Sequence, residues 1–151
     1  MKILFVCTGN TCRSPLAQGL ATHYLPESFE ISSSGISAYE GQPVSENAVQ
    51  ALKEKKIDIR NNKAVKLHEK LLRDADYVFA MTKKHEHYLV NAYPEFRSKI
   101  TRLGDFVGCN KDISDPWGGS LDDYKDCAKE LEEMLLILAE KLDKSTENSW
   151  R

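Results

Sequence analysis

The chain has 151 residues, of which 41% are hydrophobic and 29% charged, and its formal net charge is -2. This composition predicts one globular domain over residues 1–151, excludes a disordered or fibrous chain, and gives no electrostatic reason to expect a nucleic-acid partner. The first apolar run, residues 3–6, is too short for a signal peptide or a membrane span, so we expect a cytoplasmic protein with no membrane partner. Its four cysteines favour free thiols over a secreted disulfide framework.

The first half of the chain predicts two strands, each followed by a helix. Residues 3–6 form an uninterrupted apolar run, as expected of a central parallel strand that is covered on both faces. A polar loop follows, and Pro15 then suits the first turn of a helix whose apolar residues recur at helical spacing as far as Tyr24. Residues 29–33 predict a second strand, and residues 45–55 a second helix.

The second half continues the alternation. A short helix is expected at residues 67–73, a buried strand at 76–81, a helix at 83–92 and a weaker fourth strand at 100–103.

The last predicted helix has the clearest pattern, with apolar residues at intervals of three and four from Leu121 to Leu142. Ser120 and Asp123 are placed as a capping box at its start, and the polar tail, residues 144–151, is expected to fray. Because strands alternate with helices, the sequence predicts an α/β fold, a three-layer sandwich with a four-stranded parallel sheet. In such sheets a ligand binds at the carboxyl ends of the strands, where the loop after the first strand lies.

That loop has the composition of a phosphate-binding loop. A loop of this length that turns into a helix points successive backbone N–H groups at one anion, and Gly9 provides the backbone freedom for the tight turn. The same donors, together with a nearby arginine, stabilise the thiolate of Cys7, which is the nucleophilic form of cysteine. The loop lacks the Gly-Lys-Ser/Thr ending of a nucleotide-binding loop. After Cys7 we predict these phosphate-binding residues: Thr8, Gly9, Asn10, Thr11, Cys12, Arg13 and Ser14.

A thiolate nucleophile needs an acid to protonate the leaving group and then a base to activate water, and one carboxylate can serve both steps. Asp115 is the candidate, because it lies in a loop just before the last predicted helix and Pro116 would stiffen its approach to a site. An ordinary Asp-Pro turn is the alternative. His85 and His87 would point to different faces of a helix, so we interpret both as surface residues and predict neither a metal nor another cofactor.

These motifs together resemble those of the low-molecular-weight protein tyrosine phosphatases. The resemblance implies a metal-free enzyme that hydrolyses phosphorylated protein side chains through a cysteinyl-phosphate intermediate, and we expect a monomer. It implies that Cys7 is the nucleophile, Arg13 the clamp on the transition state, and Asp115 the general acid and then the base. The motifs that carry it are the loop from Cys7 to Pro15, Ser33-Ser34-Gly35, Ala80-Met81 and Asp115-Pro116.

The resemblance also implies roles for residues that do not react with the substrate. It implies that Asn10, Ser14 and Ser34 support the phosphate-binding loop through hydrogen bonds. It further implies that Cys12 is a redox partner that can trap an oxidised Cys7 as a reversible disulfide.

Two departures from the tyrosine-specific members bear on the substrate. Those members commonly have isoleucine at the position of Thr11 and aromatic residues, including tyrosine, after the Asp-Pro pair, where this chain has Trp117 and then two glycines. The pattern here is similar to the bacterial protein arginine phosphatases of the family. A hydroxyl can hydrogen-bond near a guanidinium-type leaving group, whereas isoleucine offers only apolar contact, and Asp115 and Asp122 could attract the guanidinium. We therefore predict that phosphoarginine is favoured, with Thr11 and Trp117 as selectivity residues and phosphotyrosine as the alternative.

Two other classes of protein remain as alternatives. A similar loop, with serine in place of Thr11, occurs in thioredoxin-coupled arsenate reductases, which need two further cysteines after the third strand. This chain has Thr82 and Leu89 in that region, and its remaining cysteines are Cys109 and Cys127, so arsenate reduction is disfavoured. A non-catalytic phosphoprotein-binding module would bind its ligand without turnover.

Overall fold

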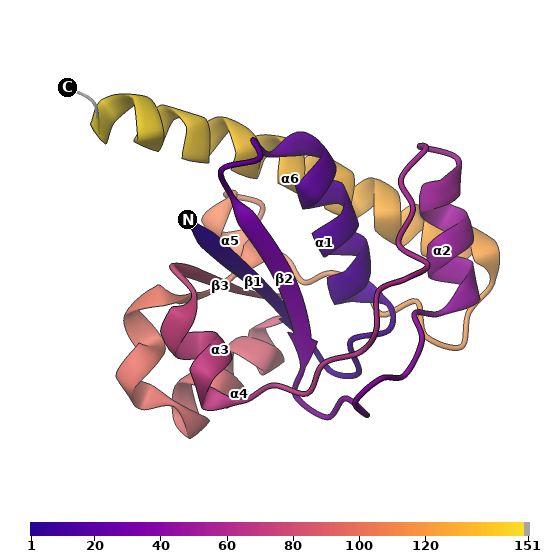
Figure 1. Cartoon of the computed structure of the whole chain (residues 1–151), viewed down its shortest axis with the longest axis horizontal. Helices are drawn as coiled ribbons and strands as arrows, with labels where there is room; N and C mark the ends of the chain where they lie inside the picture. Colours follow the sequence, from indigo (N-terminus) through magenta and orange to yellow (C-terminus); the bar gives the residue numbers. More distant parts are fainter. Residues whose placement is uncertain (150–151) are drawn as a thin grey trace.

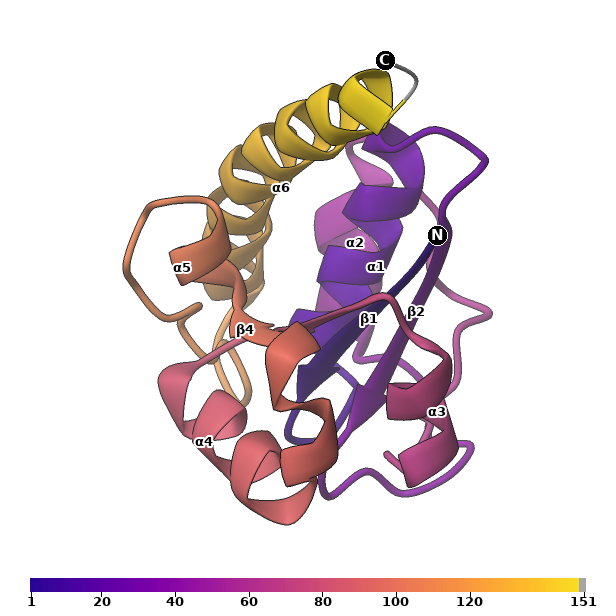
Figure 2. The same cartoon turned by 90° about the vertical axis from the view of Figure 1, so that its left-hand side faces the viewer.

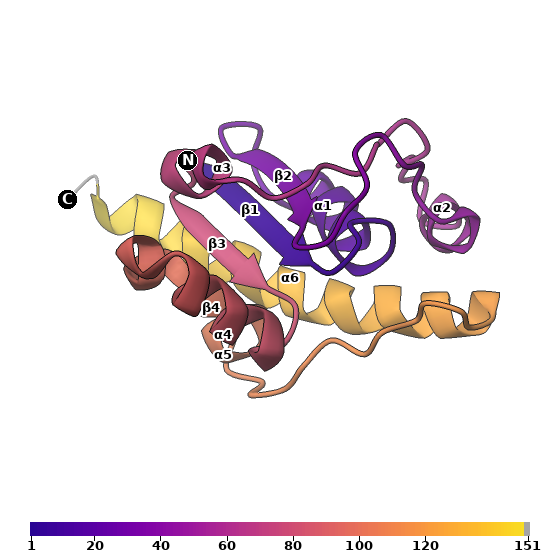
Figure 3. The ribbon, with the colours of Figure 1, turned by 90° about the horizontal axis from the view of Figure 1, so that it is seen from below.

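The computed structural model describes residues 1–149 and the side chains of residues 1–144. It contains a four-stranded parallel sheet in the order β2-β1-β3-β4, and the arrows of β1, β2 and β3 point the same way in Figure 3. The predicted parallel sheet is confirmed. The strands are β1 (Lys2–Cys7), β2 (Glu30–Gly35), β3 (Tyr77–Ala80) and β4 (Ile100–Arg102).

Helices cover both faces of the sheet, which gives the predicted three layers (Figures 1 and 2). One face carries α1 (Arg13–Tyr24), α2 (Glu46–Lys53) and α6 (Leu121–Ser149). The other face carries α3 (Glu69–Asp74) and α4 (Lys83–Ala92).

The position of β1 in the centre of the sheet explains why its sequence is apolar without alternation. Ile3 and Phe5 belong to the core under α1 and α6, whereas Leu4 and Val6 belong to the core under α3 and α4. Successive side chains of a strand point to opposite faces, and here both faces are buried. Burying one large aliphatic side chain stabilises the folded state by about 1.5–3 kcal/mol. Because β1 buries such side chains on both faces, it stabilises the packing of both helix layers against the sheet.

Some element boundaries differ from the sequence-based predictions. The last helix continues to Ser149 instead of stopping near Leu142, and residues 150 and 151, for which fraying was also predicted, lie outside the described residues. The predicted capping box at its start is present, since Ser120 N donates to Asp123 Oδ2 (2.9 Å) and Asp123 N donates to Ser120 Oγ (3.3 Å). A 3-10 helix, Pro94–Lys99, and a one-turn helix, α5 (Leu103–Phe106), flank β4 and were not predicted. None of the described helices is both long and apolar enough to span a membrane.

The pairing of β1 with β3 brings distant segments together at the carboxyl edge of the sheet. Val6 is paired with Ala80, and Met81 N donates to Val6 O at 3.1 Å, so both strands end at the same level. The loop after Cys7 and the start of α4 at Lys83 therefore leave the sheet side by side.

Candidate active site

The loop between β1 and α1 is held from behind by the side chain of Asn10. This residue is buried and has a φ of 57°, a left-handed conformation that asparagine tolerates better than most residues. Its amide donates to Ser14 Oγ (2.8 Å) and to Ser33 Oγ (2.9 Å), and its carbonyl oxygen accepts from Val65 N (2.8 Å). The loop is thus joined to α1, to β2 and to the segment before α3.

The predicted role of Ser34 is not what the structure shows. Ser34 is fully buried, but its hydroxyl has no hydrogen-bond partner among the described residues, and the neighbouring Ser33 contacts Asn10 instead. Consecutive residues of a strand point to opposite faces of the sheet. Ser33 is paired with Phe5 of β1, so both side chains lie on the face that α1 covers. The sequence does not reveal which of the two serines faces the loop.

Gly35 lets the end of β2 lie directly against the loop. A Cβ atom at this position would lie 2.6 Å from the backbone oxygen of Thr8 and 2.9 Å from the backbone nitrogen of Asn10. Any side chain there would displace the loop backbone.

Cys7, Arg13 and Asp115 meet at one pocket, although more than 100 residues separate Cys7 from Asp115. Cys7 Sγ lies 2.9 Å from Ser14 Oγ in the buried end of the loop. The Arg13 side chain is only 8% exposed; its Nη1 donates to Ile113 O (3.1 Å) and its Nη2 lies 3.5 Å from Asp115 Oδ2. The Asp115 side chain is 55% exposed at the mouth of the site.

The pocket has a volume of about 440 Å³ and includes most of the predicted residues. Asn10 and Ser14 do not line it and act from behind, and Asp122 is exposed and does not line it either. Predicted residues that line the pocket are Cys7, Thr8, Gly9, Thr11, Cys12, Arg13, Asp115 and Trp117.

Sequence reasoning missed a third wall of the pocket, formed by the loop after β2. Ser37, Tyr39 and Gln42 line the pocket from this side. Tyr39 (79% exposed) and Trp117 (76% exposed) lie at the rim of the pocket as large aromatic residues that are open to solvent. The signal that could have found Tyr39 is an aromatic residue in a Gly- and Pro-containing loop at the carboxyl end of a strand.

Cys12 lies in the same pocket with its thiol against the final helix. Its Sγ is 3.2 Å from Tyr124 Oη. Burial raises the pKa of the Cys12 thiol above its ordinary value, and burial followed by the hydrogen bond to Cys12 raises the pKa of Tyr124 to about 12. Both groups are therefore protonated near neutral pH. None of the four cysteines is disulfide-bonded in the described structure.

The interpretation of His85 as a surface residue is wrong, whereas His87 is indeed exposed. His85 is buried in the first turn of α4, and its Nε2 lies 2.8 Å from Thr8 Oγ1 in the phosphate-binding loop. Two residues that are two positions apart on a helix do face different ways, but one of these faces is turned toward the sheet. His85 is therefore a contact to the loop that sequence reasoning missed.

Acidification is expected to destabilise the protein through His85. Burial, then repulsion from Arg13, lowers the pKa of His85 from 6.5 to about 4; Lys84 acts in the same direction, and Asp115 and Asp112 oppose it. Between these pH values the unfolded chain binds a proton that the folded protein does not, so stability falls as the pH falls through this window. Between about pH 7.5 and pH 5, the free energy of unfolding measured with denaturant should fall by about 2 kcal/mol more in wild type than in His85→Gln. An equal pH dependence in both proteins would contradict this expectation.

The described side chains include no group of three or more His, Cys, Asp or Glu residues that could hold a metal ion. What the pocket presents is a cysteine, a buried guanidinium, a carboxylate and the start of a helix. A helix start and a guanidinium both favour an anion, and the cysteine and the carboxylate suit nucleophilic attack followed by proton transfer.

Comparisons with known proteins agree with this chemistry. Residues 2–148 match the family model described as low molecular weight phosphotyrosine protein phosphatase. The chain is 40% identical over 148 residues to the protein-arginine-phosphatase of Bacillus subtilis, covering 95% of this chain and 98% of that protein. It is 40% identical over 126 residues to the low molecular weight protein-tyrosine-phosphatase PtpB of Staphylococcus epidermidis, covering 83% and 87%. Among solved structures, the YwlE arginine phosphatase from Geobacillus stearothermophilus matches with a TM-score of 0.94 and 39% identity, covering 97% and 96%.

Proposed function

The chain belongs to the low molecular weight phosphotyrosine protein phosphatase family and is a cysteine-dependent protein phosphatase, and from this premise we propose that Cys7 is its nucleophile and phosphoarginine its preferred substrate. One observation carries the proposal: Cys7, Arg13 and Asp115 line a single pocket that begins at the start of a helix. The three groups supply the nucleophile, the cation and the carboxylate that a two-step phosphate transfer needs.

In the first step the Cys7 thiolate attacks phosphorus, and the bond from phosphorus to the leaving nitrogen or oxygen breaks. The hydroxyl of Ser14, 2.9 Å from Cys7 Sγ, can donate to the thiolate and hold it in line. Arg13 and the N-terminus of α1 neutralise the charge that gathers on the phosphate oxygens in the transition state. Asp115, protonated at this stage, gives its proton to the leaving group.

In the second step water attacks the cysteinyl phosphate, and the sulfur–phosphorus bond breaks. Asp115 is now ionised and takes the proton from the attacking water, so that phosphate and the thiolate of Cys7 are released. Arg13 Nη2 lies 3.5 Å from Asp115 Oδ2, so the carboxyl group of Asp115 lies next to the cation that is proposed to bind the phosphate.

Thr11 is the proposed selector for phosphoarginine. It lines the pocket together with Asp115 and Trp117, and its hydroxyl, which lies 3.7 Å from Cys12 Sγ, is proposed to hydrogen-bond to the leaving group of a bound substrate. Trp117 and Tyr39 at the rim can stack on a guanidinium or on a phenyl ring, so these aromatic residues by themselves do not decide between phosphoarginine and phosphotyrosine. The similarity to the Bacillus subtilis protein-arginine-phosphatase supports the choice of phosphoarginine.

The test compares kcat/KM for matched phosphoarginine and phosphotyrosine peptides. Wild type should prefer phosphoarginine, and Thr11→Ile and Thr11→Val should lower the ratio of the two values about tenfold or more, because both remove the hydroxyl. Thr11→Ser keeps the hydroxyl and is the matched control, so it should retain the preference. A wild-type preference for phosphotyrosine, or an equal loss on both peptides in Thr11→Val, would contradict the proposal.

A tyrosine phosphatase is the second candidate, supported by the similarity to PtpB and by the exposed aromatic rim. Arsenate reduction through a thiol relay is disfavoured, because neither Cys109 nor Cys127 lines the pocket. A redox role for Cys12, a monomeric state and a cytoplasmic location remain predictions.

A further inference from the structure

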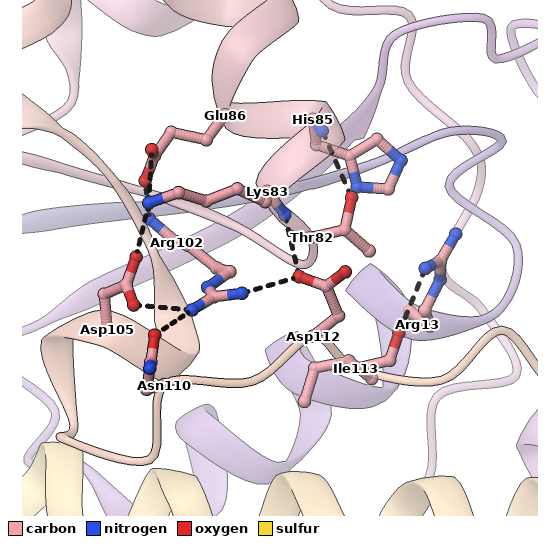
Figure 4. A network of polar contacts seen from close by, with 10 residues as sticks. All are labelled: Arg13, Thr82, Lys83, His85, Glu86, Arg102, Asp105, Asn110, Asp112 and Ile113. Atoms are coloured by element: carbon pink, nitrogen blue, oxygen red, sulfur yellow. Dashed lines mark hydrogen bonds and ion pairs between the residues drawn. The ribbon is translucent and has the colours of Figure 1, made fainter.

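The loop that carries Asp115 is anchored outside the pocket by a cluster of charged residues, shown in Figure 4. Asp112 Oδ1 accepts hydrogen bonds from Lys83 N (2.8 Å), at the start of α4, and from Arg102 Nη1 (2.9 Å), at the end of β4. The Arg102 side chain is only 9% exposed, and its Nη2 also donates to Asp105 Oδ1 (2.6 Å) and Asn110 Oδ1 (2.8 Å). The guanidinium that holds Asp112 is therefore itself held on several sides.

The next residue, Ile113, continues the anchor into the pocket. Its N–H donates to Met81 O (3.0 Å), and its carbonyl oxygen accepts from Arg13 Nη1 (3.1 Å). Residues 112 and 113 thus bind the ends of β3 and β4, the start of α4 and the phosphate-binding loop.

Asp115 has fewer contacts to other elements. Its side chain is about as exposed as that of Asp112 (55% against 51%), but one of its oxygens lies 3.5 Å from Arg13 Nη2 and the other accepts from Trp117 N (3.0 Å) within the same loop. The three peptide units from Asp112 to Asp115 span at most about 10 Å, so the place of Asp115 relative to Cys7 depends on where Asp112 is held.

We propose that Asp112 is a positioning residue, whose carboxylate, held between Arg102 and the first turn of α4, sets the place of Asp115 at the leaving group. This inference rests on the proposed role of Asp115 as the general acid. The Lys83 backbone N–H and the Arg102 guanidinium hold the pKa of Asp112 below its ordinary value, so the anchor stays ionised across the neutral range. A misplacement of about 1 Å in a reacting group can cost about 100-fold in rate, so loss of the anchor should reach the chemistry.

The test uses leaving groups that differ in their need for an acid. Phenyl phosphate releases a poor leaving group and depends on protonation, whereas p-nitrophenyl phosphate releases a good one and depends on it much less. Asp112→Ala should lower kcat/KM for phenyl phosphate by about 10- to 100-fold and for p-nitrophenyl phosphate by only a few-fold, the same pattern as in Asp115→Ala. In the Asp115→Ala background, the further change Asp112→Ala should have no additional effect on phenyl phosphate.

The matched control is Asp76→Ala. Asp76 Oδ2 accepts from Lys2 N (2.8 Å) at the opposite end of the sheet, so this variant also loses a bond between a carboxylate and a backbone N–H but should keep the wild-type ratio of the two substrates. If Asp112→Ala does not fold, the same two substrates are compared in Asp112→Asn, which keeps an acceptor oxygen and loses the charge. The same larger loss on phenyl phosphate than on p-nitrophenyl phosphate is expected.

The outcomes separate the inference from the proposed function. An equal loss on both substrates in Asp112→Ala, or an effect of Asp112→Ala that adds to that of Asp115→Ala, overturns the positioning role while leaving the acid in place. If Asp115→Ala itself does not depend on the leaving group, the assignment of the acid fails and the inference fails with it.

Discussion

Replacing Cys7 with serine is expected to lower kcat/KM for phosphoarginine and phosphotyrosine peptides by about 10⁴-fold or more, because the variant has no thiolate to form the covalent intermediate. The serine hydroxyl would be in the same place, beside Ser14 Oγ, but it does not ionise near neutral pH. Phosphate should still bind, since Arg13 and the start of α1 are unchanged. Steady-state kinetics and calorimetric binding of inorganic phosphate check the two halves of this expectation.

Cys109→Ser is the matched control for Cys7→Ser. Cys109 is an exposed free thiol outside the pocket, so its replacement should leave kcat/KM within about twofold of wild type. Turnover by Cys7→Ser above about one percent of wild type would mean that another group is the nucleophile.

Arg13→Lys is expected to lower kcat/KM by about 10²- to 10³-fold, although the positive charge is retained. The planar guanidinium of Arg13 reaches Ile113 O with one nitrogen and faces Asp115 with the other, so one buried group binds the phosphate-binding loop to the acid-bearing loop. A lysine ammonium is a single point and cannot keep both contacts while it binds two phosphate oxygens.

Arg60→Lys provides the control for Arg13→Lys, because Arg60 is exposed and does not line the pocket. It should leave kcat/KM unchanged. If Arg13→Lys retained more than about a tenth of the wild-type kcat/KM, a charge alone would be enough and the forked clamp would not be needed.

Local patterns in the sequence were sufficient to predict the four strands, the main helices and the layers of this protein, but not the 3-10 helix and the one-turn helix α5 beside β4. The apolar run in residues 3–6 predicted a strand buried on both faces, and the spacing of leucines after Leu121 predicted the long final helix. Such patterns work because burial repeats with the period of the element itself. They do not predict the order of the strands in the sheet. They also do not predict that α6 continues to Ser149, past the last apolar residue of the pattern, Leu142.

The loop from Cys7 to Ser14 could likewise be predicted, because a helix start with a cysteine and an arginine is a local arrangement. That Asp115 would act with Cys7 and Arg13 was implied by resemblance to a family, since nothing near Asp115 in the sequence points to residue 13. The distance of 3.5 Å between Arg13 Nη2 and Asp115 Oδ2 comes from the structure. The structure brings the two loops together through the contact of Arg13 with Ile113.

By itself, then, the sequence determined the α/β class and the composition of the phosphate-binding loop. Tertiary structure decided which of two adjacent serines supports Asn10, which of two histidines faces Thr8, and that Asp112 is anchored to Arg102. The physical reason is that each of these contacts joins side chains from different elements, so it depends on strand register and on helix rotation against the sheet. A one-residue shift in strand register would turn Ser34 instead of Ser33 toward the loop. His85 and His87 lie about 200° apart around the helix axis, so a rotation of about half a turn would exchange them.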